Sequence, residues 1–138
     1  VAMAGTFGYE LDPETLSGGE KDEIRKQIAC YRKYEALSCS GDYYRLSDPF
    51  EDECAAWAFV SEDREQVLLN VVMQEIHGNM TVSYVRLKGL EADAVYRDME
   101  TGTAYYGSAL MRAGIPMPVQ MGEYLAYQKY FERVKEVE

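Results

Sequence analysis

The spacing of apolar residues changes at Gly41, and this change constrains the fold more than any other feature. Before Gly41, apolar residues recur at helical spacing along one long segment. After it, short apolar runs alternate with turn residues, at the spacing typical of sandwiches and barrels. We therefore expect a mainly β protein, an antiparallel β-sandwich of about eight strands preceded by one strand and one α-helix.

The expected first strand covers residues 6–12. Phe7, Tyr9 and Leu11 alternate with small or acidic residues and would share one face, and Pro13 would end the strand. A strand with no neighbour should be mobile or should pair elsewhere, for instance with another copy of the chain.

The helix is expected to begin at Ser17 and to run to about Leu37. Ser17 and Glu20 have the spacing of a capping box, in which the two side chains satisfy the first free amides of a helix. Residues 38–41 (SCSG) should end the helix. The apolar side comprises Ile24, Ile28 and Tyr31, with Cys30, Tyr34 and Leu37 beside them.

Two strands of the expected sandwich are well marked. Cys54–Val60 is continuously apolar, which indicates a central strand covered on both faces, and 66–76 places every second apolar residue from Val67 to Met73 on one face. Residues 123–137 fit a helical stripe slightly better than a strand face. The remaining short runs are 43–46, 81–88, 94–98, 103–106 and 110–113, and prolines make 114–118 extended.

Composition excludes several classes of function. The formal net charge of −10 opposes binding to nucleic acids and to anionic membrane surfaces. No apolar run has the length of a membrane span, and the N-terminus lacks the regions of a signal peptide and does not resemble a natural start. The cysteines Cys30, Cys39 and Cys54 are too irregularly spaced for a disulfide framework or a zinc site, so we expect free thiols, a cytoplasmic location and neither metal nor cofactor.

The residues that could carry chemistry have simpler structural interpretations. Glu10 and Asp12 would lie roughly 7 Å apart on one strand face, which is within the range of distances between the two catalytic carboxylates of glycosidases. Acids are also common where a strand leads into a helix, because they hydrogen-bond to the backbone amides there. Trp57 could stack on a sugar, yet its apolar neighbours favour a place in the core. His77, next to Gly78, is expected in a surface turn. The sequence therefore assigns no catalytic residue and no metal ligand, and leaves substrate-binding residues unknown.

Seven short segments, in order, resemble family 36 glycoside hydrolases, the α-galactosidases. The likeness runs from Gly5 to about Phe131. Its segments are 5–12 (GTFGYELD) followed by 16–17 and 20–21, 41–46 (GDYYRL) followed by 48–50 (DPF), 56–61 (AWAFVS), 86–90 (RLKGL), 96–97 (YR), 106–107 with 110–111, and 114–116 (GIP).

The resemblance implies an N-terminal β-supersandwich, a catalytic (β/α)₈ barrel and a C-terminal antiparallel sandwich. Residues 1–40 would hold the last strand and helix of the barrel, and 41–138 the sandwich, with 123–133 a strand. The family hydrolyses terminal α-linked galactose from melibiose, raffinose and related sugars with two aspartates. Those lie in motifs of the type KWDxN and CxxGGGR, which this sequence lacks; Cys39-Ser40-Gly41 echoes the second without its glycine run.

The resemblance thus predicts a non-catalytic domain that packs on the barrel and stabilises it. The rest of the parent enzyme would be its partner. Whether the protein also forms a homo-oligomer is left open by the resemblance. Two alternatives are a carbohydrate-binding β-sandwich module, which exposed coplanar aromatics would favour, and an independent protein-interaction domain.

Overall fold

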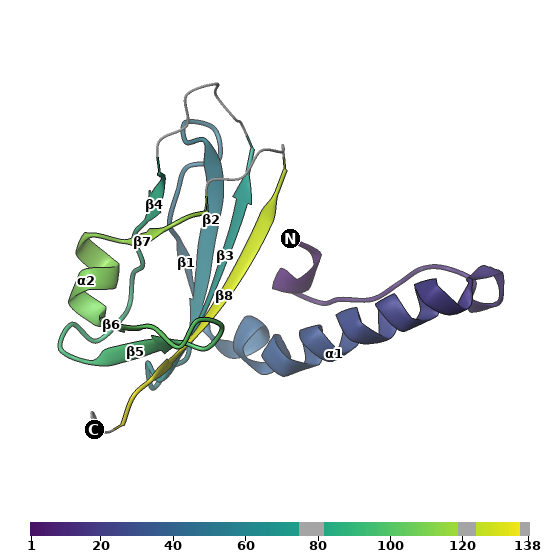
Figure 1. Cartoon of the computed structure of the whole chain (residues 1–138), viewed down its shortest axis with the longest axis horizontal. Coiled ribbons are helices and arrows are strands. Elements are labelled where there is room, and N and C mark those ends of the chain that lie inside the picture. The colour runs from purple at the N-terminus through teal and green to yellow at the C-terminus, as the bar shows by residue number, and fades with distance from the viewer. Residues whose placement is uncertain (75–81, 119–123, 136–138) are drawn as a thin grey trace.

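The computed structural model describes residues 1–74, 82–118 and 124–135 (Figure 1). Its eight strands form two antiparallel sheets, one in the order β1-β2-β3-β8-β5-β6 and one that pairs β4 with β7. The expected antiparallel sandwich is confirmed, with two sheets of unequal size. The elements are η1 (Ala2–Ala4), η2 (Pro13–Thr15), α1 (Gly18–Ser40), β1 (Asp42–Arg45), β2 (Cys54–Val60), β3 (Gln66–Met73), β4 (Tyr84–Val85), β5 (Val95–Asp98), β6 (Ala104–Tyr106), α2 (Gly107–Arg112), β7 (Ile115–Pro116) and β8 (Ala126–Arg133).

The main core lies between the six-stranded sheet and a second layer made of β4, β7 and α2 (Figure 1). Because side chains alternate along a strand, every second residue of β2 and β3 faces this layer. Phe131 of β8, Tyr96 of β5 and Leu110 of α2 are fully buried in it. The inward residues of β3 are the set expected from the sequence: Val67, Leu69, Val71 and Met73.

The opposite face of the sheet packs against the C-terminal end of α1. Leu37 is buried with Phe59 of β2 and Leu68 of β3. The ring of Tyr34 packs at a tilt against Tyr130 of β8, with 5.0 Å between the ring centroids. Both faces of β2 therefore carry buried side chains, as its continuous apolar sequence predicted. The N-terminal turns of α1 extend away from the sheet (Figure 1).

Both ends of α1 are fixed by local hydrogen bonds. The amide of Ser17 donates to Glu20 Oε2 (2.8 Å) and the amide of Glu20 donates to Ser17 Oγ (3.3 Å), so the predicted capping box is present. The helix continues to Ser40, slightly past the expected end. There the amide of Gly41 donates to the carbonyl oxygen of Leu37 (2.9 Å), and a Cβ on Gly41 would lie only 2.6 Å from that oxygen.

The strand expected over residues 6–12 is wrong. A strand needs a neighbouring ladder for its amides and carbonyls, and no described segment offers one here. The segment lies along α1 instead. Phe7 packs on Tyr31 with 5.2 Å between ring centroids, the Tyr31 hydroxyl donates to the carbonyl oxygen of Gly5 (2.9 Å), and the Tyr9 hydroxyl donates to Gln27.

Two further segments show where pattern and structure part. Residues 110–113, which we grouped with the short β-like runs, form the end of helix α2. The first residue of this helix, Gly107, lies so close to Glu91 that a Cβ on it would be 2.0 Å from the Glu91 carbonyl oxygen. The last segment is strand β8, as the resemblance implied and against its helical stripe. It pairs with β3 on one side and β5 on the other, and these two ladders outweigh a weak local preference.

Candidate functional site

The acidic pair suggested by the sequence does not form a site in the described structure. Glu10 and Asp12 are both exposed. The carboxylate of Asp12 accepts a hydrogen bond from the amide of Glu14 (2.9 Å) and so begins η2. Asp12 therefore has the structural role that acids commonly take before a helix.

The cysteines are separate from one another. Cys30 and Cys39 are exposed on α1, and Cys54 is buried in β2. The two helical thiols are nine residues apart, about 13 Å along the axis, which is too far for a disulfide. Among the described residues, no three His, Cys, Asp or Glu side chains gather as a metal site would need. His77 lies outside the described residues.

Trp57 lies on the face of the sheet toward α1, half-buried beside Phe59 and Leu68. Its packing agrees with the core position expected from the sequence, although part of the ring stays accessible. Of the exposed aromatics, Tyr43 of β1 lies on the same face and packs edge-on against Phe59, with 5.8 Å between ring centroids, whereas Tyr106 belongs to β6 at the opposite edge of the six-stranded sheet. These two tyrosines cannot form one stacking platform for a sugar.

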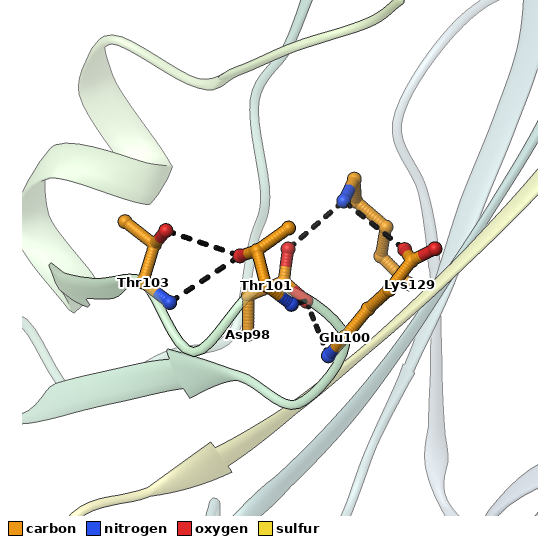
Figure 2. A network of polar contacts seen from close by, with 5 residues as sticks. All are labelled: Asp98, Glu100, Thr101, Thr103 and Lys129. Carbon is orange, nitrogen blue, oxygen red and sulfur yellow. Dashed lines mark hydrogen bonds and ion pairs between the residues drawn. The ribbon is translucent and has the colours of Figure 1, made fainter.

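A network of polar groups around a buried carboxylate lies at the β5–β6 turn, shown in Figure 2. Asp98 is 1% exposed, and one carboxylate oxygen accepts from Lys129 Nζ of β8 (2.9 Å). The other accepts from the amides of Glu100 (2.9 Å) and Thr101 (3.3 Å). Thr101 and Thr103 are joined by a hydroxyl–hydroxyl hydrogen bond across the same turn (3.1 Å).

Electrostatics explain why this carboxylate stays ionised. Burial alone would raise the pKa of Asp98, but the hydrogen bonds from Lys129 and from the two turn amides outweigh burial and lower it. Burial likewise acts to lower the pKa of Lys129, and its bonds to Asp98 and Glu100 reverse that and raise it. Both oxygens of Asp98 are used within the protein, so the network holds the turn against β8.

Sequence reasoning did not single out this network. The available signal was an acid directly before a turn marked by Thr101 and Gly102, because Asp side chains often accept from amides two residues on. Lys129 gave no such signal: it belongs to a strand that the local pattern favoured as a helix.

A groove of about 640 Å³ lies between the N-terminal segment and α1. Phe7, Leu11 and Leu16 line one side, and Ile24 and Ile28 of the helix line the other. Leu11 is 43% exposed although it faces this groove. The apolar side of α1 before its C-terminal turns is therefore covered by one thin segment, well short of the cover that a helix in a complete domain receives.

Residues 54–131 match the family model described as the glycosyl hydrolase family 36 C-terminal domain. The chain belongs to this family. The matched residues run from β2 through Phe131 in β8, and so include the main core and the network of Figure 2. The resemblance drawn from seven short segments is thereby confirmed.

Individual relatives agree. The bifunctional alpha-galactosidase/sucrose kinase AgaSK of Mediterraneibacter gnavus is 54% identical over 136 residues, which are 99% of this chain and 14% of that protein. The solved galactosidase domain of AgaSK superposes with a TM-score of 0.90 and 53% identity, over 96% of this chain and 18% of that one. A Geobacillus stearothermophilus alpha-galactosidase AgaA variant, solved with raffinose, superposes with a TM-score of 0.88 and 37% identity, over 96% of this chain and 18% of that one.

This chain therefore spans less than a fifth of each of these relatives. The likeness to the solved chains covers 96% of this chain, so it includes α1 as well as the sandwich. Within the described ranges, no helix combines the length and apolar character that crossing a membrane requires.

Proposed function

We propose that this chain is the non-catalytic C-terminal part of an α-galactosidase, and that it packs on the catalytic barrel and stabilises it. The observation that carries the proposal is the match of 99% of this chain to 14% of an alpha-galactosidase/sucrose kinase. Asp12 and Asp98 support it, because their carboxylates are engaged in holding a helix start and a turn.

The proposed boundary between barrel and sandwich lies at Gly41. In the parent, residues 1–40 would contribute the last strand and helix of the barrel, where neighbouring barrel strands would supply the ladder that residues 6–12 lack in this chain, and 41–138 would form the sandwich. The end of α1 at Ser40 and the start of β1 at Asp42 support this division. So does the thin cover over α1, since a barrel helix has neighbours along both sides and the strand at its inner face.

The proposed substrates of the parent enzyme are oligosaccharides that end in α-linked galactose, of the melibiose and raffinose type. The raffinose complex of the related AgaA supports this class. We place the parent in the cytoplasm, because Cys30 and Cys39 are exposed free thiols and a reducing compartment preserves such groups.

The test is hydrolysis of p-nitrophenyl α-galactoside by this chain alone, by the preceding portion of the parent chain alone, and by the two mixed. We expect no hydrolysis by this chain, and the highest activity or the slowest thermal inactivation in the mixture. Hydrolysis by this chain alone would refute the non-catalytic role and would make Glu10 and Asp12 the first residues to replace. A full-length parent enzyme that does not hydrolyse α-galactosides would refute the assignment of activity.

A further inference from the structure

The sheet face toward α1 is covered over only part of its length. Three cross-strand rows, each with one residue from β2, β3 and β8, make up this face: Phe59-Leu68-Tyr130, Trp57-Asn70-Gln128 and Ala55-Val72-Ala126. The first row lies under Leu37 and Tyr34 of α1. We call the other two the open rows. Cover decreases along the series, from Leu68 at 1% exposed to the exposed Ala126.

A groove of about 420 Å³ lies between the open rows and the N-terminal residues 1–4. Trp57, Asn70, Val72, Ala126 and Gln128 line its floor. The cover on its other side is light, because η1 has no buried residue and Val1 is 83% exposed. Central strands of a sheet, lined here by alanine, valine and tryptophan, are thus left without a packed layer above them.

Asn70 adds a polar requirement to this apolar floor. Its side chain is 9% exposed, and its Oδ1 accepts a hydrogen bond from Gln128 Nε2 (2.9 Å). Its Nδ2 is buried and finds no acceptor among the described residues. A buried amide donor without an acceptor is unfavourable, and native structures rarely keep one. If the oxygen and nitrogen of both side-chain amides were exchanged, Asn70 Oδ1 would take the buried position, so a polar partner is required in either arrangement.

The spacing of the rows indicates what would fit. Successive rows on one face are two residues apart, about 6.7 Å, so the third row lies about 13 Å from the first. Neighbouring helices pack about 8–10 Å apart. A segment lying beside α1 would therefore cover the open rows.

We propose that the open rows dock the part of the parent chain that precedes Val1, with an oxygen acceptor placed at Asn70 Nδ2. This inference rests on the proposed function. Two observations select this occupant: Val1 itself lines the groove, so the preceding chain enters here, and over four-fifths of AgaSK lies outside the region that this chain matches. The surface also continues the packing that α1 already makes with the first row.

The first experiment uses Trp57 as a probe, because it is the single tryptophan of the chain. The chain is labelled with 5-fluorotryptophan, and its one ¹⁹F resonance is followed while the unlabelled preceding portion of the parent is added. We expect the resonance to shift on binding, and Asn70→Leu to weaken binding about tenfold or more, as the loss of a buried hydrogen bond predicts.

A matched pair of arginine substitutions separates docking from folding. Ala126 and Ala104 are both exposed alanines in strands, but only Ala126 lies in the open rows. We expect Ala126→Arg to abolish the shift of the Trp57 resonance and Ala104→Arg to leave it unchanged. In the full-length parent, Ala126→Arg should lower the melting temperature by more than it does in this chain alone, whereas Ala104→Arg should lower both equally.

Several outcomes would overturn the inference. A Trp57 resonance that stays fixed while the mixture hydrolyses α-galactosides places the contact elsewhere and leaves the proposed function standing. Equal binding by the Ala126→Arg and Ala104→Arg variants does the same. A shift produced by millimolar raffinose without the preceding portion would make the groove a saccharide site. A shift with no α-galactosidase activity would support docking and refute the proposed function instead.

Discussion

Replacing Asp98 by asparagine removes the charge at the centre of the turn network and keeps the size of the side chain. Asp98 is 1% exposed, and Lys129, whose side chain is 14% exposed, lies 2.9 Å from it. Removing one member of a buried ion pair costs about 3–5 kcal/mol. Lys129 keeps a second contact with Glu100 Oε2 (3.6 Å) and some access to water, so we expect a smaller loss, about 2–3 kcal/mol.

Urea unfolding measures this loss, because the midpoint falls while the slope stays constant when only stability changes. For a chain of this size the loss corresponds to a melting temperature lower by roughly 6–15 °C. The exposed Asp93 provides a matched control, and Asp93→Asn should change the unfolding free energy by less than about 0.5 kcal/mol. Combined with Lys129→Met in a double-mutant cycle, Asp98→Asn should show a favourable coupling energy of about 1–3 kcal/mol.

The pH dependence gives an independent check. The folded pKa of Asp98 lies below its ordinary value of 3.8, so its contribution is present above that value and is lost as pH falls through the folded pKa. The folded pKa of Lys129 lies above 10.5, so its contribution is complete below that value and is lost as pH rises through the folded pKa. Asp98→Asn should therefore flatten the acid limb of the stability profile. An unchanged acid limb, or a loss like that of Asp93→Asn, would refute the reasoning.

Two further substitutions test the packing around Glu91. Tyr96→Phe should lower the free energy of unfolding in urea by about 1–3 kcal/mol. The buried hydroxyl accepts from the Glu91 amide (3.1 Å) and donates to the Arg64 carbonyl oxygen (3.0 Å), and both groups would lose this partner. An unchanged free energy of unfolding would mean that water replaces the hydroxyl. Gly107→Ala should destabilise by about 1–3 kcal/mol or more, since its Cβ would lie 2.0 Å from the Glu91 carbonyl oxygen, whereas Gly19→Ala, with no atom within 4 Å, should be neutral or stabilising. Equal melting temperatures for the two alanine variants would contradict this close approach.

Most elements of the fold were predictable because their signals are local. The capping box of Ser17 and Glu20 needs only four consecutive residues, and the observed helix starts where it predicts. The inward face of β3 and the double-sided cover of β2 follow from alternation and from continuous apolar sequence. The family, too, was predictable from short segments in order.

The candidate site was less predictable. The residues that sequence reasoning considered, Glu10, Asp12 and Trp57, have structural roles or stay apart in the described structure. The pairs that matter most, Asp98 with Lys129 and Asn70 with Gln128, join residues 31 and 58 positions apart. Neither pair has a local pattern, because each depends on the register between strands that are distant in the sequence.

The sequence by itself determined that this protein has one capped helix followed by an antiparallel β domain, since periodicity and caps act over a few residues. Only the tertiary structure decided which of the ambiguous segments became strands. Residues 6–12 have the alternation of a strand but no neighbouring ladder, so they lie along α1. Residues 126–133 have a helical stripe, yet β3 and β5 offer ladders on both sides and make them a strand. A strand is completed by its neighbours, and a single segment carries no information about whether they are present.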